Sequence, residues 1–77
     1  MSLLYVVVYT LDFIVRTRIF KTSEEAKKFM YKEVGETMAK VNLESVQGIE
    51  STDWSTKIIY KYGCIERWTI DISHIEA

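Results

Sequence analysis

Few residues of the chain have side chains suited to catalysis or metal binding. None is accompanied by the further catalytic or ligand residues that such chemistry needs. The chain has one histidine, His74, and one cysteine, Cys64. A general base needs a serine, cysteine or carboxylate placed to use it, and a zinc site needs several cysteine or histidine ligands. Glu24 and Glu25 are adjacent at a predicted helix start and point in different directions, so they form no acid–base pair. The sequence therefore predicts a protein that is not an enzyme and uses no metal or cofactor.

The sequence does favour noncovalent binding, because cations recur among aromatic and aliphatic residues in two segments that are typical of β-hairpins. Alternate strand residues share a face, so Arg16 and Arg18 share one with Tyr9, and Lys57 shares one with Ile59. The candidate partner-binding residues are Tyr5, Val7, Tyr9, Ile14, Arg16, Arg18, Phe20, Lys57, Ile59, Lys61, Ile65 and Arg67. A plain solvated sheet, whose side chains cover one another across strands, is the alternative interpretation.

Residues 4–20 predict the first hairpin, with a turn over Thr10–Phe13 that places Tyr9 opposite Ile14. A one-residue slip would turn Arg16 and Arg18 toward the core, where unpaired charges are costly. We therefore expect the arginine face to lie outside and the aliphatic face to pack in the core. The expected core face holds Leu4, Val6, Val8, Phe13, Val15 and Ile19.

Residues 54–72 predict the second hairpin, in which Gly63 supplies the positive φ that a short turn between Lys61 and Ile65 requires. The pairing places Ile58 opposite Trp68, and alternation again separates two faces. We expect Trp54, Thr56, Ile58, Trp68, Ile70 and Ile72 to face the core, with a partly buried His74 on the same side. The outer face is mostly cationic.

Between the hairpins, Thr22 and Glu25 form a capping-box pattern that predicts the start of a helix. Apolar residues then recur at steps of three and four, which predicts a helix with one face against the sheet. These residues are Ala26, Phe29, Met30, Val34, Met38 and Val41. Gly35 marks either a close approach to the sheet or an early fraying point. Residues 42–53 lack a clear period and predict a loop, with at most a helical remnant.

These elements predict an α+β fold, a four-stranded antiparallel sheet with one helix packed on one face, in the chain order β-β-α-β-β. One domain over residues 1–77 is enough for a chain of this length. The apolar content of 48% leaves aliphatic and aromatic residues outside the predicted core. Monomers seldom expose a contiguous patch of that kind, so we expect a homo-oligomer or a protein partner to cover it.

The run Phe20-Lys21-Thr22-Ser23-Glu24-Glu25-Ala26 resembles the strand-to-helix junction of the arm-type DNA-binding domains of phage integrases. Those domains place three strands before the helix and lack a second hairpin, so this chain departs from their topology and no DNA-contacting residue is carried over. The whole pattern, including the closing Trp-x-Ile, more nearly resembles small uncharacterised bacterial and phage proteins. That resemblance implies a compact accessory or inhibitor-like protein that acts through contacts.

The sequence thus predicts a non-enzymatic interaction module that self-associates or binds a protein through its outer sheet face. The alternative is an accessory protein that binds single-stranded nucleic acid or DNA through the same basic and aromatic face, although the net charge of −1 counts against it. No small-molecule substrate is indicated. The lone Cys64 suggests a reducing cytoplasm. The apolar segment from Leu3 to Val15 contains Asp12 and predicts neither a signal peptide nor a membrane span.

Overall fold

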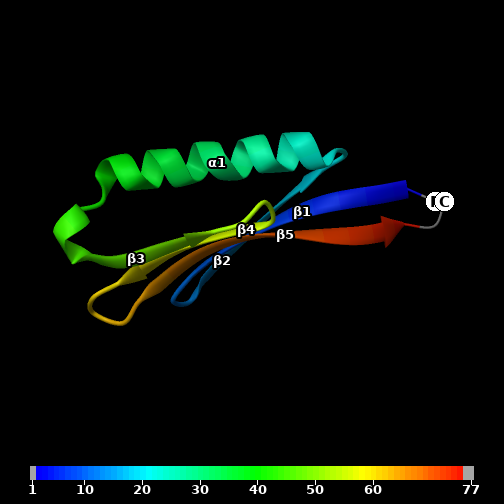
Figure 1. Cartoon of the computed structure of the whole chain (residues 1–77). Helices are drawn as coiled ribbons and strands as arrows, with labels where there is room; N and C mark the ends of the chain where they lie inside the picture. The colour runs from blue at the N-terminus through cyan, green and yellow to red at the C-terminus, as the bar shows by residue number, and fades with distance from the viewer. Residues whose placement is uncertain (1, 76–77) are drawn as a thin grey trace.

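The computed structural model describes residues 2–75, which form a five-stranded antiparallel sheet with one helix on one of its faces (Figure 1). The elements are β1 (Ser2–Leu11), β2 (Ile14–Phe20), α1 (Ser23–Lys40), a short 3-10 helix η1 (Leu43–Ser45), β3 (Val46–Ser51), β4 (Ser55–Tyr60) and β5 (Ile65–Ile75). The predicted α+β class is confirmed. The predicted number of strands is wrong, since the order is ββαβββ. We call the face under α1 the helix side and the opposite face the helix-free face.

The strands are arranged in the order β2-β1-β5-β4-β3, so the first and last strands of the chain lie at the centre. β1 and β5 pair antiparallel from Ser2 opposite Ile75 to Leu11 opposite Glu66. This long pairing joins the two hairpins into one sheet, and it brings the beginning of β1 beside the end of β5 (Figure 1). β2 and β3 form the two edges.

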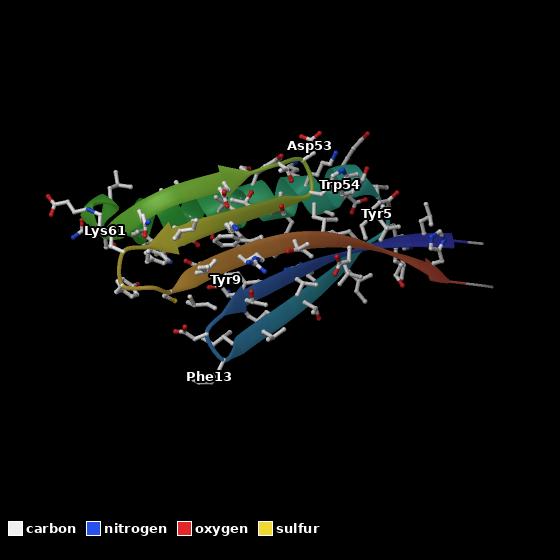
Figure 2. All side chains as sticks on the ribbon, turned by 60° about the horizontal axis from the view of Figure 1, so that its bottom comes forward. Tyr5, Tyr9, Phe13, Asp53, Trp54 and Lys61 are labelled. Carbon is white, nitrogen blue, oxygen red and sulfur yellow. The ribbon has the colours of Figure 1, made fainter. Side chains whose placement is uncertain are left out.

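The β1–β2 turn is tighter than the sequence suggests. Only Asp12 and Phe13 separate the strands, and Asp12 adopts a φ of 53°. Leu11 therefore lies opposite Ile14, and Tyr9 lies opposite Arg16, two residues from the predicted partner. A shift of two leaves every side chain on its predicted face of the hairpin. Phe13 was expected in the core, but it projects fully exposed from the tip (Figure 2).

In the first hairpin, the face that we expected to lie outside is the face that packs against α1. Val7 and Tyr9 are buried beneath the helix, and Tyr5 and Phe20 pack against them. The aliphatic residues that were predicted for the core lie instead on the helix-free face, as their pairing shows. These are Leu4, Val6, Val8, Val15 and Ile19.

This inversion has a physical reason. Aromatic rings bury more area than valines, so the face with three rings gains more from covering by the helix. The arginines avoid the expected penalty because β2 is an edge strand, where Arg16 and Arg18 remain exposed although they lie on the helix side.

The second hairpin has the predicted orientation. Thr56, Ile58, Trp68 and Ile70 are buried on the helix side. The two strands pair two residues away from the predicted register, so that Thr56 and not Ile58 lies opposite Trp68. The turn between them spans residues 61–64. Gly63 has the predicted positive φ, at 93°. Two residues expected in the core remain substantially exposed near its margin, Trp54 at 39% and Ile72 at 49%.

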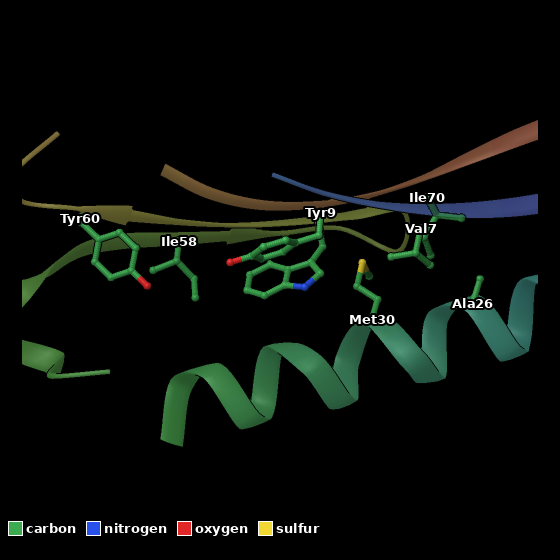
Figure 3. Close-up of a cluster of buried hydrophobic side chains, with 8 residues drawn as sticks. Val7, Tyr9, Ala26, Met30, Ile58, Tyr60 and Ile70 are labelled. Carbon is green, nitrogen blue, oxygen red and sulfur yellow. The ribbon is translucent and has the colours of Figure 1, made fainter. Parts of the chain in front are cut away.

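The helix begins where the sequence predicts. The Thr22 hydroxyl accepts a hydrogen bond from the Glu25 backbone N–H at 3.1 Å. Ala26 and Met30 are buried and point from α1 toward Val7 and Ile70 (Figure 3). Phe29, Val34, Met38 and Val41 pack at the edge of this core, which confirms the predicted stripe. No helix among residues 2–75 is long and apolar enough to cross a membrane.

The segment predicted as a loop, residues 42–53, contains η1 and the edge strand β3. Asn42 caps η1 by accepting from the Glu44 backbone N–H at 3.0 Å. β3 then pairs with β4, with an irregularity in register between Val46 and Gly48. Most of its side chains are exposed, so the strand lacks the apolar alternation by which a strand is recognised in sequence.

Candidate functional site

The structure divides the predicted partner-binding residues between the two sides of the sheet, so the single surface that we expected does not exist. Tyr5, Val7, Tyr9, Ile14, Arg16, Arg18 and Phe20 lie on the helix side, whereas Lys57, Ile59, Ile65 and Arg67 lie on the helix-free face. Lys61 lies in the β4–β5 turn. Because Val7 and Tyr9 are core residues, their predicted place on an accessible docking face is wrong.

The helix-free face carries five aliphatic side chains over β1 and β2, which we call the aliphatic patch, and Thr17 lies between the two members on β2. The aliphatic patch consists of Leu4, Val6, Val8, Val15 and Ile19. The three β1 members are partly shielded by their neighbours. Val15 and Ile19 on the edge strand are 64% and 61% exposed. No described segment of the chain lies over this face (Figure 1).

Charged side chains lie on the same face over β5, β4 and β3, of which only β5 adjoins the aliphatic patch. Asp71 of β5 lies opposite Val6, and Arg67 lies opposite Lys57. Lys57 forms an ion pair with Glu50 of β3, with Nζ and Oε2 2.8 Å apart. Glu50, Lys57 and Arg67 line a depression of about 470 Å³. The helix-free face is thus mostly aliphatic over β1 and β2, whereas over β4 and β5 it carries charged residues together with Ile59 and Ile65.

A buried carboxylate organises the helix side. Glu66 accepts hydrogen bonds from the Tyr9 hydroxyl and, at 2.6 Å, from the Tyr60 hydroxyl. Burial raises the pKa of Tyr9 to about 12, and the hydrogen bond to Glu66 acts in the same direction. The same two causes raise the pKa of Tyr60. Glu66 was not predicted as a site residue, although its even position on β5 places it on the same face as Trp68 and Ile70.

The two arginines of β2 lie on aromatic rings. The Arg16 guanidinium carbon is 4.5 Å from the centre of the Tyr9 ring. The Arg18 guanidinium carbon is 4.9 Å from the centre of the Phe29 ring of α1 and 5.9 Å from that of Phe20. Because Glu66 fixes the Tyr9 hydroxyl, the hydrogen-bond network also fixes the ring beneath Arg16.

Cys64 lies in the β4–β5 turn, and His74 lies near the end of β5. The Cys64 thiol donates to the Asp12 carboxylate, with Sγ and Oδ1 3.2 Å apart, and this contact joins the two hairpin turns. Burial and the nearby carboxylate raise the pKa of Cys64, which keeps the thiol protonated and a poor nucleophile. His74 is exposed, so the prediction that it is partly buried is wrong.

Comparison with known proteins offers no assignment for either side of the sheet. No family model matches the chain, and no curated protein and no solved structure matches it.

Proposed function

We propose that the protein is a non-enzymatic interaction module that associates with a second copy of itself through the aliphatic patch. The observation that carries this proposal is the exposure of Val15 and Ile19 on an uncovered sheet face that also carries Leu4, Val6 and Val8. Sheets with apolar faces pack against each other about 10 Å apart. Such packing would remove this aliphatic surface from water, which favours association.

The border of the patch supports a self-complementary contact. Protein interfaces combine an apolar centre with a polar rim. A twofold interface brings the same surface of both copies together, so acids and cations on one rim can meet their opposites on the other. The rim on β5 carries both signs, with Asp71 opposite Val6 as the acid and Arg67 opposite Thr10 as the cation.

Nucleic-acid binding, the other function that the sequence suggests, has less support. That hypothesis requires the cations to share one face with accessible aromatic rings. Arg16 and Arg18 lie on the helix side, whereas Lys57 and Arg67 lie on the helix-free face. This hypothesis uses Tyr5 or Tyr9 to stack on a base, but the Tyr9 ring is buried and the Tyr5 ring stacks on Trp54.

Sedimentation equilibrium of the wild type, Val15→Glu and Ile19→Glu tests the proposal. The wild type should dimerise with rising concentration, and this equilibrium should respond little to salt because the contact is apolar. Each glutamate would place a charge in the interface and should yield monomers. Leu43→Glu is the matched control, since Leu43 is 66% exposed but lies on η1. A wild type that remains monomeric, or a control that dissociates equally, would contradict the proposal.

A further inference from the structure

β2 is an accessible sheet edge with a regular ladder. Six of its seven residues are exposed, and the strand pairs with β1 without a bulge. In an edge strand of an antiparallel sheet, every second residue directs its backbone N–H and C=O away from the neighbouring strand. The other edge is less suitable for pairing, because β3 has an irregular register at Gly48. β2 can therefore accept another strand.

Arg16 and Arg18 follow this edge on the helix side. Residues two apart on a strand are separated by about 7 Å, which is also the spacing of alternate side chains on a paired strand. Both guanidinium groups rest on aromatic rings, at 4.5 Å from Tyr9 and 4.9 Å from Phe29. Neither arginine forms an ion pair with a carboxylate among the described residues. Their hydrogen-bond donors are thus held in place without an acidic partner.

A pocket of about 210 Å³ opens between β2 and α1 beside these arginines. Val7 and Tyr9 form its floor, and Phe29 and Glu33 line it from the helix. A side chain that projects on the helix side from a strand paired with β2 would lie next to this pocket. The edge and the pocket together make one site, which is separate from the aliphatic patch.

Electrostatics restrict what can occupy the site. If β2 paired antiparallel with β2 of a second copy around Thr17, Arg16 of one copy would lie opposite Arg18 of the other, and like charges across strands are destabilising. The bases of a nucleic acid could not stack on these rings, because guanidinium groups cover them. Its phosphates would also lie near the Glu33 carboxylate on the pocket wall. An extended peptide with alternate acidic residues avoids the repulsion between arginines, and it does not need free aromatic rings. Each of its carboxylates suits the fork geometry of a guanidinium group.

We propose that the β2 edge binds an extended acidic segment of another protein, which adds a sixth strand to the sheet and pairs alternate carboxylates with Arg16 and Arg18. Backbone hydrogen bonds to the edge would provide affinity, and the two arginines would select the acidic sequence. This site does not depend on self-association of the protein.

The probe for this proposal is a fluorescein-labelled peptide of about seven residues in which glutamate alternates with threonine. Fluorescence anisotropy should show saturable binding that weakens as salt is raised. Arg16→Gln and Arg18→Gln should each lower the affinity about tenfold or more. Lys40→Gln, which removes an exposed cation from the last turn of α1, should leave the affinity unchanged. Glu33→Gln removes the acid of the pocket wall and should raise the affinity, an effect that misfolding cannot produce.

Two further probes separate the proposed mode from its alternatives. A peptide with glutamine in place of glutamate should bind much more weakly. A glutamate peptide methylated on every backbone nitrogen should not bind, because neither of its edges can donate hydrogen bonds to β2. Equal binding of either peptide would overturn the proposal. So would the absence of binding by the glutamate peptide, or tighter arginine-dependent binding of single-stranded oligothymidylate.

Discussion

Glu66 is a buried carboxylate whose two tyrosine partners lie in the core of the protein. A hydrogen bond to a charged group contributes about 1.5–3 kcal/mol to stability. Leaving a buried acceptor without its donor lowers the free energy of unfolding. We therefore expect Tyr9→Phe to lower the free energy of unfolding by about 1.5–3 kcal/mol in urea denaturation. Tyr62→Phe is the control, because Tyr62 is exposed and stacks on Tyr60 from outside the core. Similar losses in the two variants would show that the Glu66 hydrogen bond contributes little.

The same tyrosines predict how stability depends on alkaline pH. The pKa of Tyr9 rises from 10.0 to about 12 on folding, so the folded state favours the neutral phenol. This contribution is fully present below pH 10 and is lost as the pH rises toward about 12, because the unfolded chain releases the proton first. The free energy of unfolding should fall across that window. Replacing both Tyr9 and Tyr60 by Phe should make the fall shallower, and an unchanged slope would contradict the assignment.

The first hairpin shows what could be predicted about the site from single residues. Alternation correctly grouped Tyr9 with Arg16, and Val6 with Val8. The choice of the buried group was wrong because it assumed that an arginine on the core side must be buried. At the edge strand this is not so, since Arg16 covers the Tyr9 ring and still reaches solvent. Edge position depends on the order of strands, which local alternation does not determine.

Among the elements, the helix and both hairpins could be predicted, whereas β3 could not. α1 has a capping threonine and a regular apolar stripe, and both reflect local physical requirements. β3 forms mainly through backbone pairing with β4, with few side chains in the core. An exposed edge strand needs no apolar alternation, so its sequence is similar to that of a loop.

Replacing glycine by alanine should have opposite effects on stability in the β4–β5 turn and in α1. A methyl group at Gly63 or Gly35 would meet no other atom, so only backbone conformation should matter. Gly63 has a φ of 93°, and Gly63→Ala should destabilise the protein by about 1–2 kcal/mol. Gly35 lies inside α1, where Gly35→Ala should stabilise by about 1 kcal/mol. Chemical denaturation measures both changes, and equal signs would contradict this account of the turn and the helix.

At the scale of the whole molecule, a single helix covers one side of an elongated sheet. The described chain extends 48 × 22 × 17 Å, and its core lies between α1 and the helix side. The central pairing of β1 with β5 joins residues at opposite ends of the chain, and no local pattern specifies it. This pairing also determines which strands become edges and which face stays uncovered. The proposed interaction surfaces therefore follow from topology more than from hairpin sequence.

The central claim is that the aliphatic patch is the surface by which two copies meet. Isotope-filtered NMR on a mixture of labelled and unlabelled protein tests it directly, since it detects only contacts between different chains. We predict intermolecular contacts from the methyl groups of Val6, Val15 and Ile19, with none from Ala26 or Met30 beneath the helix. Intermolecular contacts confined to other surfaces, or none at concentrations where the aliphatic patch should associate, would contradict the claim.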